Sequence, residues 1–402
     1  MLFRSYIILL SNIFAQRDWD RFGCDYFRQR GYEVMAVELA DLLRPGLRGD
    51  MEHDGFKSLD AVRSIVTIED MDALAAEFGP GDLIVNNVLL DAGSAPVYWA
   101  LSRHQVKYVA LYLNSMPTGW YRGGPKDGLR EYIRIKLSDF GGRLSRLRVT
   151  LRYMLNKDID WNRVQPPRWW VRAGHFHSQL GATFPKLWAA EVVKTHSFDV
   201  ESAQVMAPMT QHRKPYAVFV DDGFLDPAHP DFVFAGRPMP VSLKKYGVAI
   251  GDALRRVQAE LGLDVVVAMH PKSDRAHGER IFGDAFEITQ GKSADLIRGA
   301  EFALMHCSTA VSFAAMFETP VLFMTTDEIE SDDYYRDFIA RLASWFGQSR
   351  VNIDHLPGTL SVPPLDKKAI ADYRAAFLFE PDAAPEPIWQ TVAERFENSL
   401  GA

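Results

Sequence analysis

The sequence predicts an α/β protein with two domains, each built on a parallel β-sheet that helices cover on both faces. Three observations support this prediction. The chain has 402 residues, which is too long for a single hydrophobic core of ordinary size. In both halves, apolar segments of strand length alternate with helical patterns. These segments contain few polar positions, which is typical of parallel strands that are buried on both faces.

The first domain is predicted to cover residues 1–207 and to be Rossmann-like. Its predicted strands are residues 6–10, 33–37, 64–68, 82–86 and 107–113. Its predicted helices are residues 19–29, a segment that starts near residue 69, and residues 95–102. The Gly79-Pro80-Gly81 segment ends the second of these helices, because glycine and proline both interrupt helical structure.

A basic helical insertion is predicted at about residues 125–160 of this domain. Apolar residues recur there at spacings of three and four, which indicates helices with one apolar face. Arg143, Arg146, Arg148 and Arg152 lie among the remaining positions. Two interpretations stay open: a packed insertion with a solvated basic side, or a surface that contacts anionic lipid or a phosphate-bearing acceptor.

The second domain is predicted at residues 215–380 and is again Rossmann-like. Its predicted strands are residues 216–220, 264–269, 286–289, 302–305 and 321–324. Its predicted helices lie within residues 241–260 and at residues 293–298 and 310–317. Residues 386–402 are predicted to form a last helix that crosses back to the first domain. The two domains are expected to face each other across a cleft at the carboxyl ends of their strands, where such sheets bind ligands.

Composition restricts the class of protein. The chain is 47% hydrophobic and 24% charged, and its net charge of -7 argues against general nucleic-acid binding. Two cysteines exclude a disulfide framework and predict a reducing, cytoplasmic compartment. The apolar segment at residues 6–10 is too short for a signal peptide. A cytoplasmic protein is therefore expected, with peripheral contact at the inner membrane if the basic helices bind lipid.

Two common phosphate-binding motifs are absent. The segment that follows the first strand, residues 11–16, contains no glycine, which counts against a dinucleotide-binding enzyme. The sequence also has no Gly-x-x-x-x-Gly-Lys-Ser/Thr motif, so P-loop phosphoryl transfer is not expected.

Three polar motifs instead follow predicted strands of the second domain. They are Asp221-Asp222-Gly223, His270-Pro271-Lys272-Ser273 and His306-Cys307-Ser308-Thr309. An imidazole and hydroxyl groups at the carboxyl ends of neighbouring parallel strands form a plausible phosphate site. Each motif also has a structural interpretation: Asp221 and Asp222 can form a turn, His270 can be a buried core histidine, and Ser308 can be a helix N-cap.

In this order, the three motifs resemble those of bacterial sialyltransferases and related nonulosonate or Kdo transferases, which have the GT-B fold. The resemblance covers roughly residues 215–330. It implies that His270, Ser308 and Thr309 hold the phosphate of a CMP-sugar, with Pro271 and Lys272 in the same loop. It assigns the role of general base to Asp221. The neighbouring Asp222 is a further candidate to line the cleft.

Asp221 closes the first strand of the second domain, whereas some sialyltransferases carry the acidic motif in the first domain. A second candidate base is therefore Asp18, which follows the first strand of the first domain next to Arg17. Three Asp-x-Asp segments match the metal-binding motif of the other glycosyltransferase fold, but so short a pattern arises by chance in a chain this acidic. The group of His175, His177, His196 and Asp199 has no third ligand at a recognisable spacing, so no metal and no cofactor are expected.

The predicted function is that of an inverting, metal-independent glycosyltransferase. It is expected to transfer a sialic acid-like or Kdo-like sugar from a CMP donor to a bacterial surface polysaccharide, such as capsule or lipopolysaccharide, or to a glycolipid. The alternatives are a UDP- or GDP-sugar donor, a glycerol or polyol phosphate transferase, and a sugar-nucleotide binding protein without catalytic activity.

Overall fold

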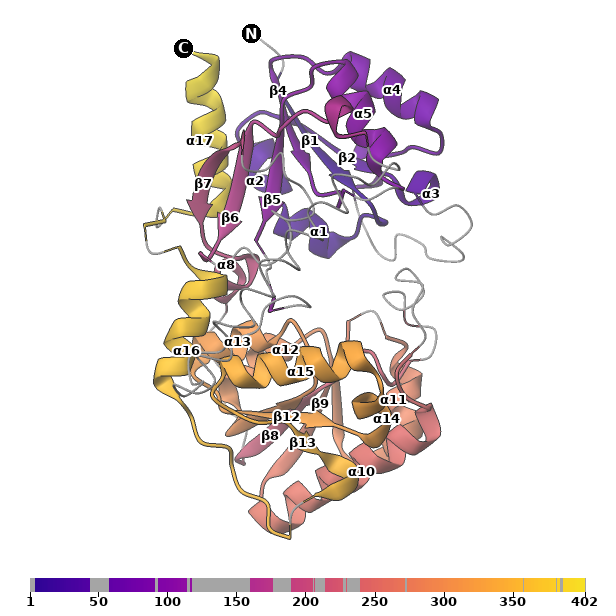
Figure 1. Cartoon of the computed structure of the whole chain (residues 1–402), viewed down its shortest axis with the longest axis vertical. Coiled ribbons are helices and arrows are strands. Elements are labelled where there is room, and N and C mark those ends of the chain that lie inside the picture. The colour runs from indigo at the N-terminus through magenta and orange to yellow at the C-terminus, as the bar shows by residue number, and fades with distance from the viewer. Residues whose placement is uncertain are drawn as a thin grey trace. The chain divides into compact units, whose positions relative to one another are not determined.

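The computed structural model describes residues 4–43, 58–90, 93–113, 116–117, 160–175, 189–204, 206, 214–226, 229, 239–271, 273–356, 358–380, 382–383 and 386–401. The chain divides into two compact units (Figure 1). Unit 1 comprises Met1–Leu113, Leu137–Phe198 and Glu380–Ala402, and unit 2 comprises Asn114–Lys136 and Asp199–Phe379. The basic helices predicted at residues 125–160 lie outside the described residues, apart from residue 160.

Unit 1 contains a parallel sheet of seven strands in the order β3-β2-β1-β4-β5-β6-β7. The strands are β1 (Ser5–Leu10), β2 (Glu33–Glu38), β3 (Val62–Ser64), β4 (Asp82–Asn86), β5 (Tyr108–Tyr112), β6 (Trp169–Ala173) and β7 (Glu191–Thr195). The helices are α1 (Gln16–Arg21), α2 (Cys24–Gln29), α3 (Ala40–Leu43), α4 (Ile68–Glu77), α5 (Ala95–Arg103) and α17 (Ile388–Leu400). The chain moves outward from β1 to β3 and then returns to place β4 on the other side of β1, which is the Rossmann order.

Both faces of this sheet are buried, as the apolar strands predicted. Tyr6 and Ile8 of β1 belong to one core cluster, which includes Trp389 of α17. Ile7 and Leu9 belong to a second cluster, to which α4 and α5 contribute. Successive side chains of a strand point to opposite faces, so an uninterrupted apolar strand requires cover on both sides.

Two local predictions in unit 1 were wrong. The single helix predicted at residues 19–29 is two helices, because Gly23 adopts a left-handed conformation with φ 60° between them. A Cβ atom at Gly23 would also collide with the ring of Trp389, whose Nε1 donates to the carbonyl of Arg21 at 2.7 Å. The strand predicted at residues 64–68 ends at Ser64, because Thr67 caps α4 by accepting a hydrogen bond from the Asp70 N–H at 3.1 Å.

Unit 2 contains a parallel sheet of six strands in the order β10-β9-β8-β11-β12-β13. The strands are β8 (Tyr216–Val220), β9 (Asp264–Met269), β10 (Glu287–Gln290), β11 (Phe302–Met305), β12 (Val321–Thr325) and β13 (Val351–Asn352). The helices are α8 (Phe198–Gln204), α10 (Leu243–Leu261), α11 (Arg275–Phe282), α12 (Ser293–Gly299), α13 (Val311–Phe317), α14 (Asp327–Ser331), α15 (Asp333–Trp345) and α16 (Lys367–Tyr373). The predicted fold class, two Rossmann-like parallel-sheet units, is confirmed. None of the helices in the described ranges is long and apolar enough to span a membrane.

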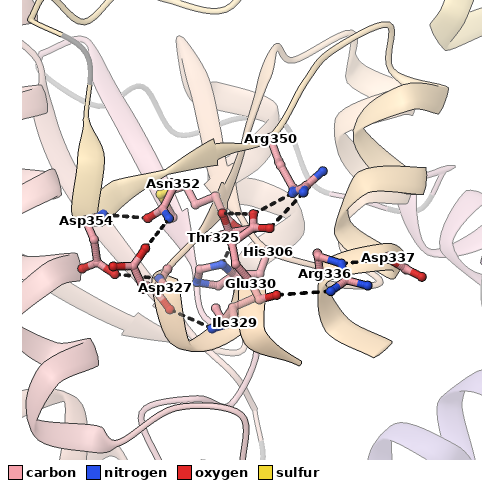
Figure 2. Close-up of polar contacts among 12 residues, drawn as sticks. His306, Thr325, Asp327, Ile329, Glu330, Arg336, Asp337, Arg350, Asn352 and Asp354 are labelled. Atoms are coloured by element: carbon pink, nitrogen blue, oxygen red, sulfur yellow. Dashed lines mark hydrogen bonds and ion pairs between the residues drawn. The ribbon is translucent and has the colours of Figure 1, made fainter. Parts of the chain in front are cut away.

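A polar cluster joins α14 to the last strand of unit 2 (Figure 2). Arg350 binds both carboxylate oxygens of Glu330, with Nε–Oε1 and Nη2–Oε2 distances of 2.6 and 2.9 Å. Thr325 Oγ1, at the end of β12, donates to the same carboxylate at 2.8 Å. These bonds lower the pKa of Glu330 below its ordinary value. The cluster therefore fixes the β13 end of the sheet.

Arg350→Ala is expected to lower the free energy of unfolding by roughly 1–2 kcal/mol, because hydrogen bonds to a charged group are lost. The effect is limited because the side chains of Arg350 and Glu330 are 34% and 26% exposed, so water screens their charges. Because the folded-state pKa of Glu330 is lowered, this stabilisation is present above the ordinary value of 4.5 and is lost as the pH falls through the folded-state value. Urea unfolding at pH 7 measures the effect. Arg255→Ala is the control, since its pair with Asp252 is exposed, and an equal cost for both variants would contradict the prediction.

Candidate functional site

The candidate site lies at the carboxyl edge of the unit 2 sheet. The strand order reverses at β8: the chain adds β9 and β10 on one side of β8, and then β11, β12 and β13 on the other. In doubly wound sheets of this order, ligands bind where the chain changes direction, outside the carboxyl ends of the strands. The three predicted motifs follow β8, β9 and β11, so the topology brings their loops to one edge.

Asp221 is the first residue after β8, and its carboxyl group contacts the loop that follows β9. Its backbone N–H donates to the Ala268 carbonyl at 2.9 Å, and its Oδ2 accepts a hydrogen bond from the His270 N–H at 3.4 Å. The residue is 1% exposed, and its Oδ1 accepts no hydrogen bond from the described residues that meets ordinary geometry. Burial raises the pKa of Asp221 to about 6, which backbone N–H groups oppose.

Asp222 contacts the opposite neighbour of β8. Its Oδ2 and Oδ1 accept hydrogen bonds from the backbone N–H groups of His306 and Cys307, at 3.0 and 3.3 Å. Burial raises the pKa of Asp222, the two N–H bonds lower it, and the nearby Asp221 raises it. Successive side chains at a strand end point in opposite directions. The two aspartates therefore fasten the β9 loop and the β11 loop to the end of β8.

Gly223 completes this motif for a steric reason. Its φ of 85° lies in the left-handed region that favours glycine. A Cβ atom there would lie 2.7 Å from Cδ2 of His229, a residue that is 1% exposed. The glycine thus makes room for a buried imidazole.

His270 lies in the loop after β9, half-buried, next to the exposed Pro271. Its Nδ1 lies 2.7 Å from Nε2 of His229. Gln290, at the end of β10, holds the loop by donating from Nε2 to the carbonyls of His270 and Ser273 at 3.0 and 2.7 Å. Lys272 lies outside the described residues. The loop is therefore shaped by contacts from two strands, β8 and β10.

His306 has a structural position rather than a place at the edge. It is fully buried. Its Nε2 lies 2.8 Å from Tyr246 Oη, and its Nδ1 lies 2.7 Å from the Met324 carbonyl oxygen. A carbonyl only accepts, so Nδ1 carries the proton and Nε2 accepts from the tyrosine. Burial lowers the pKa of His306 to about 4, so the ring is neutral at pH 7.

Ser308 and Thr309 lie between β11 and α13. Ser308 is half-buried and its Oγ accepts a hydrogen bond from the Ala310 N–H at 3.3 Å, whereas Thr309 is exposed. The N-cap of α13 is Ala310, so Ser308 precedes the cap by two residues. Both hydroxyls are thus in the loop at the edge of the sheet, beside the residues that Asp222 holds.

Arg17 and Asp18 belong to unit 1, where they form the first turn of α1 after β1. Asp18 Oδ2 accepts a hydrogen bond from the Ala15 N–H at 3.2 Å, and its side chain is 16% exposed. Arg17 is exposed, with Nη2 3.8 Å from Asp18 Oδ1. Asp18 therefore combines a helix-capping contact with a partly solvated carboxylate.

Sequence reasoning missed two buried polar residues of the site, His229 and Asp226. Asp226 Oδ2 accepts a hydrogen bond from the Asp274 N–H at 2.9 Å, and its Oδ1 lies 3.4 Å from His277 Nδ1. A signal for His229 exists in the sequence, because His229-Pro230 repeats the His270-Pro271 pair. Among the residues that the structure describes, no three His, Cys, Asp or Glu side chains are grouped to hold a metal ion.

Comparison with known proteins gives the fold alone. No protein-family model matches the sequence, and no curated protein matches it. Among solved structures, Staphylococcus aureus MnaA with UDP is 12% identical over 99% of this chain and 97% of its own, with a TM-score of 0.44. Acinetobacter baumannii MurG is 12% identical over 98% and 99%, with a TM-score of 0.44. The wall teichoic acid polymerase TagF is 9% identical over 98% and 89%, with a TM-score of 0.45. At these identities and scores, the similarity does not specify an activity.

Proposed function

We propose that the protein is a glycosyltransferase of the GT-B class that binds the phosphate of a nucleotide-sugar at the carboxyl edge of the unit 2 sheet. The reaction is inverting and metal-independent. The donor is a CMP-linked nonulosonate-type sugar, and the acceptor is a glycan or glycolipid of the bacterial surface.

One observation carries this proposal: Asp221 and Asp222 tie the loops that follow β9 and β11 to the strand between them. This fixes the His270 loop and the Ser308 loop on either side of the point where such sheets bind nucleotides. Imidazole and hydroxyl groups are suitable donors to a phosphate oxygen. The buried charge of Asp221 costs stability, which is typical of a site kept for function.

The proposed step is one direct displacement. An acceptor hydroxyl oxygen forms a bond to the anomeric carbon as the bond from that carbon to the phosphate oxygen breaks. The bonding electron pair leaves with the phosphate, and the hydroxyl proton passes to a carboxylate. In this proposal His270, Ser308 and Thr309 stabilise the charge that develops on the leaving phosphate.

We propose Asp18 rather than Asp221 as the proton acceptor. A general base must come within hydrogen-bond reach of the hydroxyl. Asp221 is 1% exposed and contacts the backbone, whereas the Asp18 side chain is 16% exposed. We therefore assign Asp221 a positioning role and propose Asp18 as the base.

His270→Ala is expected to weaken CMP binding by about 10- to 100-fold, because a hydrogen bond to a charged group contributes about 1.5–3 kcal/mol. Isothermal titration calorimetry with CMP measures the effect. His355→Ala is the matched control, since the His355 side chain is 69% exposed and lies in the same unit. Wild-type affinity in a folded His270→Ala protein would remove this histidine from the site.

The nucleotide is tested by thermal shift with CMP, CDP, UDP and GDP. A ligand at 100 times its dissociation constant adds about 2.7 kcal/mol of stability, so the preferred nucleotide stands out. A larger shift with UDP or GDP would replace the CMP donor, and a product that carries phosphorus would identify a glycerol or polyol phosphate transferase. Contact with anionic membrane remains a proposal that rests on the basic sequence of residues 125–160.

A further inference from the structure

His229 and His270 form a pair whose ring nitrogens lie 2.7 Å apart. We infer that His229 is a positioning residue that shares a proton with His270 and so determines the protonation of the His270 nitrogen that meets the donor phosphate. This inference rests on the proposed function, because it assigns His270 a phosphate ligand. His229 itself is buried at 1% exposure, so it acts through His270 rather than on the donor.

The chemistry of two imidazoles explains the role. A nitrogen–nitrogen distance of 2.7 Å requires one proton between Nε2 of His229 and Nδ1 of His270. If His229 donates that proton, neutral His270 carries its own proton on Nε2. If His229 accepts it, the proton lies on Nδ1 of His270, and Nε2 of a neutral His270 carries no proton. A second proton, on Nε2, then makes His270 a cation. His270 Nε2–H is therefore a donor when His229 donates the shared proton, and whenever the pair is a cation, and a phosphate oxygen requires such a donor.

The pair can therefore balance a change in the charge of the ligand by taking up a proton, without a change in the positions of the two rings. The phosphate of a CMP-sugar is a diester with one negative charge, whereas the CMP that leaves is a monoester with up to two. Uptake of one proton from solvent converts the neutral pair into a cation that is spread over two rings. A charge-assisted hydrogen bond between the rings stabilises this form.

The fold holds the second histidine in place. Gly223 has φ 85°, and any Cβ atom there would lie within 3.0 Å of three atoms of the His229 ring. The His229 and His270 rings are 4.4 Å apart between centroids and inclined by 74°, so the contact is edge to face. The glycine of the Asp-Asp-Gly motif is thus matched to His229.

Acidic groups on the surrounding elements favour the cation. Asp221 accepts from the His270 N–H, and it is ionised above its pKa of about 6. Asp222, whose pKa burial raises to about 8, is largely uncharged at pH 7 and adds little. Asp226 precedes His229 in the same loop and pairs with His277 of α11, whose N-cap is Asp274. A nearby negative charge stabilises the protonated form of an imidazole.

The test is proton uptake on CMP binding. Calorimetry in buffers of different ionisation enthalpy counts the protons taken up at each pH from 5.5 to 8.5. The wild type is expected to take up a fraction of a proton that approaches one, with tighter binding as the pH falls. His229→Phe keeps a ring but no nitrogen, and is expected to bind CMP about tenfold more weakly and with less proton uptake. His229→Gln retains a donor and an acceptor, and is expected to restore part of the affinity.

Ring-nitrogen NMR of protein labelled in its histidines separates this inference from the proposed function. The Nδ1 signal of His270 is assigned as the signal that disappears in His270→Ala. In the absence of CMP, His229→Phe is expected to shift this signal. If the wild type binds none of the four nucleotides, the proposed function fails while this signal still reports the shared proton. The inference is overturned if His229→Phe leaves the His270 signal, the proton uptake and the CMP affinity at wild-type values.

Discussion

Asp18→Asn is expected to lower turnover of the donor by about 10²- to 10⁴-fold while CMP affinity stays near the wild-type value. The amide keeps the shape of the side chain, and its oxygen can still accept from the Ala15 N–H, so α1 remains capped. What the variant loses is the basicity that removes the acceptor proton. Asp20→Asn is the matched control, since Asp20 is exposed in the same helix. The measurement is kcat with saturating donor and acceptor.

The same assay decides the role of Asp221. A positioning residue that holds the His270 loop should change donor affinity more than turnover when it becomes Asn. A large loss of turnover in Asp221→Asn, with little loss in Asp18→Asn, would make Asp221 the base and overturn our assignment. Near-normal turnover in both variants would leave the proposed deprotonation without a carboxylate, and the mechanism would fail.

Asp221→Asn is also expected to change how stability depends on pH. The folded-state pKa of Asp221, about 6, lies above its ordinary value of 3.8. The contribution of such a group is fully present below the ordinary value and is lost as the pH rises through the folded-state value. A rise from 3.8 to about 6 corresponds to about 3 kcal/mol. The variant should therefore gain about this much relative to the wild type between pH 4 and pH 7.

Urea unfolding of both proteins across this pH range measures the difference. His306 also titrates there in the unfolded chain, and its lowered pKa makes stability rise with pH, but it is present in both proteins and cancels. Asp252→Asn is the control because its side chain is 64% exposed. Parallel pH profiles for Asp221→Asn and the wild type would mean that Asp221 titrates as an ordinary surface aspartate.

The central strands of both sheets could be predicted because their continuous apolar sequences indicate burial on both faces. Residues 216–220 and 265–269 are apolar throughout, and the structure places strands β8 and β9 at the predicted bounds, 216–220 and 264–269. The edge strand β7 carries no such pattern, since Glu191 and Val192 are exposed and only Val193 and Thr195 are buried. The strand β13 has only two residues, too few for any periodicity. Edge strands need tertiary contacts to be recognised.

For the candidate site, the sequence indicates which loops meet but not what each side chain contacts. The placement of Asp221 and His270 at adjacent strand ends follows from the strand pattern and the rule for parallel sheets. The burial of Asp221, the neutral ring of His306 and the contact of His229 with Gly223 depend on packing between residues distant in sequence. No local pattern encodes those contacts.

The last helix, α17, has a consequence for the order in which the chain acquires structure during synthesis. Trp389 and Phe396 of this helix complete the core of unit 1, where Trp389 contacts Tyr6, Phe22 and Phe27. Unit 2 lies between the two ends of unit 1 in sequence. Once residues 199–379 have emerged from the ribosome, most of unit 2 can fold. At that point strand β1, which is synthesised first, still lacks the α17 side chains that complete its core. Until α17 emerges, the nascent unit 1 exposes an aromatic surface of the kind that chaperones bind.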